Sequence, residues 1–98
     1  MPTSAEENVH VGQIEIHYWA AAKAAAGVAQ DVLEVAEAVT LSEVVRRAVD
    51  LHQDTRLADV LQVCSALVDD RPVKRLDPET VLVEPGQSVE FLPPFAGG

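Results

Sequence analysis

The fold is decided by the stretch Thr40-Leu41-Ser42-Glu43-Val44-Val45-Arg46-Arg47-Ala48-Val49-Asp50-Leu51-His52, which carries the strongest helix signal in the chain. Thr40 and Glu43 have capping-box spacing, in which each side chain bonds a free backbone N–H of the first helical turn. Apolar residues then recur every three or four positions and form one stripe: Leu41, Val44, Val45, Ala48 and either Leu51 or His52. Because Arg46, Arg47 and Asp50 fall on the opposite side, we predict that this helix packs its stripe across one face of a sheet.

The residues before this helix predict a hairpin. From Val11 the side chains alternate, with Ile14, Ile16 and Tyr18 on one face and Gln13, Glu15, His17 and Trp19 on the other. A period of two over this length predicts a half-buried strand. The alanine-rich run 20–26 favours a short helix, and Gly27 is a natural stop for it. Residues 31–37, with Leu33 and Val35 on one face, predict a second strand paired with the first.

The residues after the helix predict further short elements. A second helix is expected over 56–63, and strands over 66–68 and 72–75 are expected to join at Asp69-Asp70-Arg71. Residues 76–85 are expected to form a loop whose Pro85-Gly86 pair is typical of a type II turn. Residues 88–92 predict a final strand with Val89 and Phe91 on one face.

This order of elements predicts the α+β class, with a mixed sheet packed on one main helix. The β-grasp arrangement fits the order, although other small α+β folds share it. The polar residues 1–9 predict a disordered tail, residues 10–93 one folded domain, and residues 94–98 a flexible C-terminal tail.

Composition excludes several classes of function. The formal net charge of −9 disfavours nucleic acid and anionic membrane surfaces as partners. No stretch reaches the roughly 18 apolar residues of a membrane span, and the acidic start does not resemble a signal peptide, so we expect a cytoplasmic protein. The single cysteine, Cys64, excludes an internal disulfide, and the three histidines show no metal-ligand spacing. No metal site or nucleophile motif is therefore predicted.

The C-terminal segment of the chain is a candidate functional site. It closes Phe91-Leu92-Pro93-Pro94-Phe95-Ala96-Gly97-Gly98. Pro93 and Pro94 favour an extended stem, and Gly97 and Gly98 lack the Cβ atoms that would hinder entry into a narrow channel. The Gly98 carboxylate is a poor electrophile, but adenylation with ATP would make it reactive enough to accept sulfur.

Three segments resemble the small subunit of molybdopterin synthase, a ubiquitin-like sulfur carrier. They are Tyr18-Trp19-Ala20-Ala21-Ala22-Lys23 leading to Gly27, the helix that begins after Thr40, and the ending from Phe91 to Gly98. Two turns depart from the family pattern. Family members often carry Asn-Gly where this chain has Asp69-Asp70, and Asp-Gly-Asp where it has Pro85-Gly86-Gln87.

The resemblance implies a carrier cycle rather than an enzyme. A ubiquitin-activating-like adenylyltransferase would adenylate Gly98 with ATP, and a sulfurtransferase would supply sulfur to form a thiocarboxylate. The tail of Phe95, Ala96, Gly97 and Gly98 would enter the large subunit of molybdopterin synthase. Sulfur would pass there to cyclic pyranopterin monophosphate, with acid–base groups supplied by that subunit and no cofactor bound to this chain. Resemblance also implies a heterotetramer of two small and two large subunits.

Two apolar residues fall on otherwise polar strand faces. Trp19 and Leu92 would form one patch beside the tail if the first and last strands are neighbours, and we predict that this patch docks partners with Lys23 at its rim. Alternatively, a loop or the short helix covers both residues.

Two other functions stay open from the sequence. One is a sulfur carrier for another product, such as cysteine or thiamine thiazole. The other is a ubiquitin-like modifier or binding module whose tail is conjugated to lysine or is inert. The first differs from the molybdopterin carrier in its acceptor, and the second in the fate of the tail.

Overall fold

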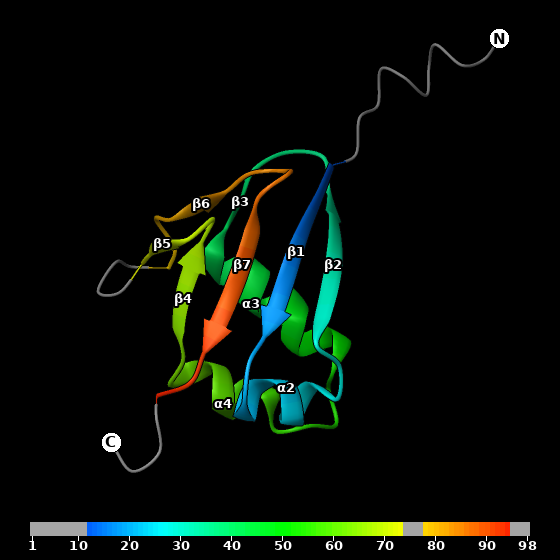
Figure 1. Cartoon of the computed structure of the whole chain (residues 1–98). Helices are drawn as coiled ribbons and strands as arrows, with labels where there is room; N and C mark the ends of the chain where they lie inside the picture. Colours follow the sequence, from blue (N-terminus) through cyan, green and yellow to red (C-terminus); the bar gives the residue numbers. More distant parts are fainter. Residues whose placement is uncertain (1–11, 74–77, 95–98) are drawn as a thin grey trace, which may run out of the picture.

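The computed structural model describes residues 12–73 and 78–94 of the 98-residue chain. A five-stranded sheet in the order β2-β1-β7-β4-β5 forms its centre (Figure 1). The strands are β1 (Gly12–Tyr18), β2 (Gln30–Val35), β4 (Ser65–Val68), β5 (Arg71–Pro72) and β7 (Ser88–Leu92). β1 and β7 run parallel, whereas the other pairs are antiparallel, so the sheet is mixed as the sequence predicts.

Within residues 12–73 and 78–94, three helices cover the sheet on one side and at one end. They are α2 (Ala21–Ala26), α3 (Leu41–Leu51) and α4 (Leu57–Gln62). In Figure 1, α3 lies behind the sheet, while α2 and α4 lie across the end near which β1 and β7 finish. The opposite face of the sheet has no helix over it in this view. This arrangement confirms the predicted α+β, β-grasp class.

The core lies between the sheet and α3, and the predicted alternation is confirmed on both central strands. Ile14, Ile16 and Tyr18 of β1 are buried, as are Val89 and Phe91 of β7. The remaining core side chains come from every helix and from β2, β4 and β6: Ala22, Ala26, Leu33, Val35, Leu41, Val44, Ala48, Leu57, Leu61, Val68 and Val83. Removing this apolar surface from water is the main force that holds the fold together.

The N-terminus of α3 is capped as Thr40 predicts. The Thr40 Oγ1 accepts a hydrogen bond from the Glu43 backbone N–H at 3.1 Å. The expected reciprocal bond is replaced, because the Glu43 carboxylate accepts from the Arg46 guanidinium at 2.6 Å. Leu51 is 53% exposed, so it does not continue the apolar stripe. The helix ends there, and His52 adopts an extended φ of −133° and packs edge-on against Tyr18.

Three turns contain residues with positive φ, at Gly27, at Gly86 and at Asp69-Asp70. Gly27 ends α2 in the left-handed region with φ 80°, and Gly86 has φ 95° after Pro85, as a type II turn requires. The β4–β5 turn is shorter than predicted. Val68 pairs with Arg71, so only Asp69 and Asp70 form the turn, both with positive φ.

Several strand predictions need correction. The predicted loop 76–85 contains a strand, β6 (Leu82–Val83), which pairs with β3 (Val39–Thr40) in a separate two-stranded sheet. Two residues are too few to show a period of two, so no strand is predicted there from alternation. In place of the predicted strand 72–75, the structure has β5 at Arg71–Pro72. Residues 74 and 75 of the predicted strand lie outside the described part of the chain. β2 ends at Val35 rather than at residue 37.

The predicted N-terminal tail, residues 1–9, lies outside the described residues, as does most of the C-terminal tail predicted from residue 94. Among the described helices, none has the length and apolar character needed to span a bilayer.

Candidate functional site

The stem of the C-terminal tail leaves the sheet from its middle. β7 pairs with β1 on one side and with β4 on the other, and its last residue, Leu92, lies opposite Ser65. Pro93 and Pro94 follow directly, and because proline has no N–H to donate, strand pairing ends at this point. Pro93 is half-buried and Pro94 exposed. The predicted site residues Phe95, Ala96, Gly97 and Gly98 lie outside the described part of the chain.

Trp19 lies beside the end of β7, on the open face of the sheet. Its backbone N–H donates to the Phe91 carbonyl at 3.3 Å, so the predicted neighbourhood of the first and last strands is confirmed. Its side chain is 50% exposed. The indole Nε1–H donates to Glu90 Oε1 at 3.0 Å. Leu92, the next outward residue of β7, is half-buried. Trp19 is therefore not a core residue.

Lys23 lies one helical turn beyond Trp19. Its backbone N–H donates to the Trp19 carbonyl at 3.4 Å, and its side chain is exposed on α2. A tight turn produces this arrangement. The Ala22 N–H bonds the Trp19 carbonyl at 3.0 Å, and Ala20 has φ 50° and ψ −121°, the backbone of the first central residue of a type II′ turn. The turn takes the chain from β1 directly into α2, so that Trp19 and Lys23 lie close in space.

The histidines in the described region bind carboxylates rather than forming a metal site. His52 Nε2 lies 2.6 Å from Asp31 Oδ2, and the Tyr18 hydroxyl donates to the same oxygen at 2.9 Å. Burial, and then the bond to Asp31, raise the pKa of the Tyr18 hydroxyl well above its usual range. No group of three or more potential metal ligands is found among residues 12–73 and 78–94.

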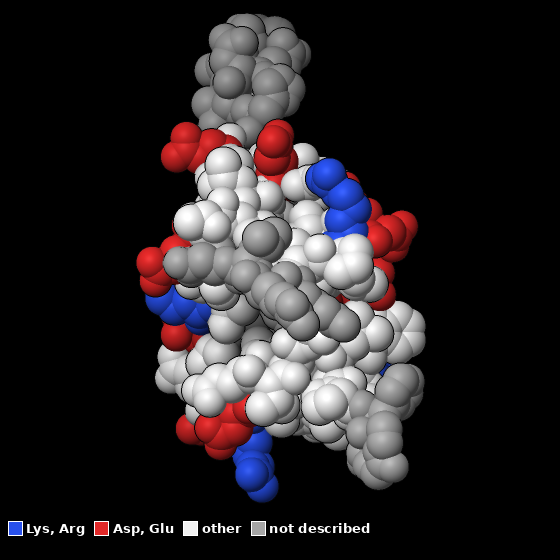
Figure 2. Space-filling view, turned by 90° about the vertical axis from the view of Figure 1, so that its left-hand side faces the viewer, with Lys and Arg blue, Asp and Glu red and all other residues white. Residues whose placement is uncertain are grey.

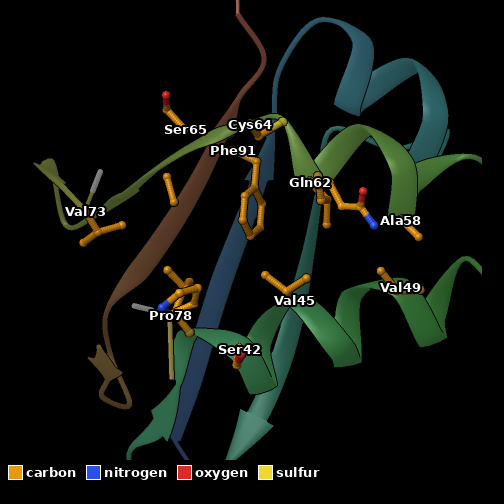
Figure 3. Close-up of a pocket in the computed structure, with 13 residues that line it drawn as sticks. Ser42, Val45, Val49, Ala58, Gln62, Cys64, Ser65, Val73, Pro78 and Phe91 are labelled. Carbon is orange, nitrogen blue, oxygen red and sulfur yellow. The ribbon is translucent and has the colours of Figure 1, made fainter. Parts of the chain in front are cut away.

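A cavity of about 560 Å³ lies on the inner side of the sheet, between α3, α4 and β4 (Figure 3). The Phe91 ring points into it, and aliphatic side chains such as Val45 and Leu61 form most of its wall. Cys64 also lines the cavity, and burial raises the pKa of its thiol, which favours the unreactive protonated form. None of the described residues lining the cavity is charged.

Sequence reasoning missed two side chains that the fold brings into the site region. Glu90 bonds Trp19 across 71 positions of sequence. Asp31 joins Tyr18 and His52. The alternation of β7 places Glu90 on the outer face, but only the register between β1 and β7 puts it beside Trp19. Alternation with Leu33 and Val35 turns Asp31 inward, but its partners come from two other elements and cannot be read from the local sequence.

The fold and the stem together define a class, the ubiquitin-like proteins of β-grasp shape. The crystal structure of SAMP1 from Haloferax volcanii superposes with a TM-score of 0.73 at 17% identity, covering 89% of this chain and 100% of that one. Urm1 from Trypanosoma brucei superposes with a TM-score of 0.59 at 14% identity, covering 91% and 98%. A chain from the Helicobacter pylori complex of subunits 1 and 2 of molybdopterin-converting factor superposes with a TM-score of 0.60 at 20% identity. The match covers 88% of this chain and 99% of that one.

Residues 16–98 match the model of the ThiS family. The chain belongs to this family, and it is a small, non-catalytic sulfur carrier of ubiquitin-like fold. Among curated proteins, none matches its sequence.

Proposed function

We propose that this chain carries sulfur on the C-terminal carboxylate of Gly98 and donates it to cyclic pyranopterin monophosphate in molybdopterin biosynthesis. One observation carries the proposal. A Pro93-Pro94 stem leaves the central strand of a β-grasp domain, and the ThiS-family match extends from residue 16 through the terminal Gly97-Gly98 pair. A slim terminus on a stiff stem suits a reaction in which the tail, not a pocket of this chain, carries the reacting atom.

The carrier reaction follows from carboxylate chemistry. A Gly98 carboxylate oxygen attacks the α-phosphorus of ATP, pyrophosphate leaves, and an acyl-adenylate forms. A sulfur nucleophile at the sulfide level then attacks the carbonyl carbon, and AMP leaves with the electrons of the broken C–O bond. The product is a thiocarboxylate. The absence of side chains on Gly97 and Gly98 removes steric hindrance to each attack.

Three protein partners follow from this cycle. They are a ubiquitin-activating-like adenylyltransferase, a sulfurtransferase, and the large subunit of molybdopterin synthase, whose groups would supply the acid–base catalysis. The structural likeness to the Helicobacter pylori complex of subunits 1 and 2 supports the third partner. We further propose that Trp19 and Leu92, with Lys23 at the rim, dock these proteins. Because the activation step consumes ATP, we assign the cycle to the cytoplasm.

A second candidate differs only in the acceptor of the sulfur or of the tail. The likeness to SAMP1, which is described as a small archaeal modifier protein, and to Urm1 favours a carrier or modifier outside molybdopterin synthesis. Cysteine and thiamine thiazole are acceptor pathways of the same chemistry. Conjugation would instead join Gly98 to a lysine amine, with AMP leaving in the same way.

The test is the intact mass of the protein after incubation with ATP, the activating enzyme of the same organism and a sulfur donor. We expect a gain equal to the replacement of one oxygen by sulfur, and no gain in a variant that lacks Gly98. The charged carrier is then mixed with the large subunit and cyclic pyranopterin monophosphate. Molybdopterin formation supports the proposal, a thiocarboxylate that the acceptor leaves unused favours another pathway, and no thiocarboxylate with an active enzyme contradicts the carrier function.

A further inference from the structure

The open face of the sheet is acidic, and the outward residues of its four longer strands include no lysine or arginine. On the four longer strands, the residues that alternate with the buried ones are Gln13, Glu15, His17, Gln30, Val32, Glu34, Ser65, Leu67, Ser88, Glu90 and Leu92. The ionisable members are three glutamates and one histidine. His17 Nε2 already lies 3.1 Å from Glu15 Oε1. On the other side of the sheet, α3 carries Arg46 and Arg47 together with Glu43 and Asp50, and Arg46 pairs with both carboxylates.

Glu90 lies at the centre of this open face. In the sheet register it stands between His17 of β1 and Leu67 of β4. The bond from Trp19 Nε1–H fixes one carboxylate oxygen beside the exposed indole ring. Leu67 and Leu92 are half-buried on the same face, so apolar side chains lie beside this fixed carboxylate on the β4 side and towards the end of β7, while His17 lies on the β1 side. None of the ion pairs among the described residues involves Glu90.

A partner that covers Trp19 and Leu92 must also remove water from Glu90. A carboxylate that loses its water is costly unless a cation and hydrogen bonds replace it. The single indole N–H occupies one site on Oε1, and the other oxygen keeps its lone pairs. An apolar partner surface would therefore leave the carboxylate unpaired, which limits the kinds of surface that can bind here.

We propose that the open face binds a protein partner through an arginine that pairs with Glu90 and stacks on the Trp19 ring. A guanidinium suits both contacts, since it donates to a carboxylate as a planar fork and lies flat on an aromatic face. Leu67 and Leu92 would exclude water around the pair, which strengthens it. The inference rests on the proposed function, because the partner is the activating enzyme. Both the carrier function and the modifier function require that enzyme.

Charge argues against other occupants of this face. A second copy of the chain would place glutamates opposite glutamates, because the face is acidic and the whole chain has a net charge of −9. Like charges that face each other across an interface are costly. In Figure 2, which views the side of β4 and β5, the described blue and red side chains lie mainly along the margin of the face.

The test is calorimetric binding of the full chain to the purified activating enzyme of the same organism, at low and high salt. Glu90→Gln keeps an acceptor for Trp19 and removes the charge, so we expect a loss of affinity of about tenfold at low salt and a smaller loss at high salt. Glu90→Lys should weaken binding by about a hundredfold. Glu37→Lys is the matched control. Glu37 is exposed beyond the end of β2 that pairs with Gly12, at the opposite end of β1 from Trp19.

Binding of Glu90→Gln at wild-type affinity would overturn the inference, as would an equal loss for Glu37→Lys or no binding by the wild-type chain. Because Trp19 is the only tryptophan, fluorotryptophan labelling gives one ¹⁹F signal that reports contact at this face. The signal must shift on binding. Thiocarboxylation with a neutral Glu90 phenotype would leave the carrier function intact and refute the arginine contact. Binding that depends on Glu90, without any gain of sulfur, would support the arginine contact and refute the carrier function.

Discussion

The single tyrosine allows one buried hydrogen bond to be tested directly. Tyr18 is 2% exposed, and its hydroxyl donates to Asp31 Oδ2 at 2.9 Å. Hydrogen bonds to charged groups contribute about 1.5–3 kcal/mol. Because Asp31 keeps His52 as a second partner at 2.6 Å, the loss should fall at the lower end of that range. We expect Tyr18→Phe to lower the free energy of unfolding by about 1.5 kcal/mol at neutral pH.

The pH dependence has a defined sign. The pKa of Tyr18 is raised in the folded state, so its stabilising contribution is complete below the pKa of an unfolded tyrosine, about 10. The contribution is then lost as the pH rises towards the folded-state pKa. Linkage gives a decline in unfolding free energy of about 1.4 kcal/mol per pH unit from this group above pH 10. Tyr18→Phe should lack this part of the decline.

The assay combines urea denaturation at several pH values with ultraviolet absorbance of the phenolate. Since Tyr18 is the only tyrosine, the phenolate signal reports this residue alone. We expect phenolate to appear together with the loss of circular dichroism. A reversible titration near pH 10 in a protein that stays folded would refute the reasoning. The same conclusion would follow if Tyr18→Phe and the wild type had equal slopes in alkali.

Four further predictions concern single residues. Ala20→Gly should raise the unfolding free energy by about 0.5–1 kcal/mol in urea denaturation, because glycine relieves the strain of φ 50°, whereas Ala24→Gly inside α2 should lower it by a similar amount. Thr40→Ala should cost about 1 kcal/mol through loss of the α3 cap, and Thr40→Ser should restore most of it. Gly12→Ala should destabilise by about 1–3 kcal/mol, since a Cβ at Gly12 would overlap the Cβ of Pro85, and an unchanged thermal midpoint would contradict this. Trp19→Ala should weaken binding to the activating enzyme with little loss of thermal stability, whereas a large fall in the midpoint would show that the 50% exposed ring supports the fold.

The long elements could be predicted because their signals are local. Strand β7 and the inward face of β1 follow from alternation alone, and α3 follows from one cap and one stripe. The outward position of Trp19 follows in the same way. The patch beside β7 required the extra assumption that the first and last strands are neighbours, which the parallel pairing confirms.

What the sequence did not predict depends on contacts distant along the chain. β3 and β6 have two residues each, so only their mutual pairing defines them as strands. Leu51 continues the apolar spacing of α3, but the helix stops at that residue and His52 packs on Tyr18 instead. Alternation places Glu90 on the outward face of β7 and Asp31 on the inward face of β2, but it indicates no partner for either residue. Their bonds to Trp19 and Tyr18 come from sheet register, which no short window of sequence contains.

Two adjacent residues, Tyr18 and Trp19, point to opposite faces of the sheet. Tyr18 points into the core and joins β1 to Asp31 and His52, whereas Trp19 points outward and joins β1 to Glu90. A change at Glu90 therefore alters the charge of the open face without creating a cavity in the core. The terminal glycines, in contrast, do not distinguish the proposed functions, since each carrier or modifier reaction would use the same Gly98 carboxylate. An exchange of Trp19 and Glu90 should then change partner affinity while thiocarboxylate chemistry at Gly98 stays the same.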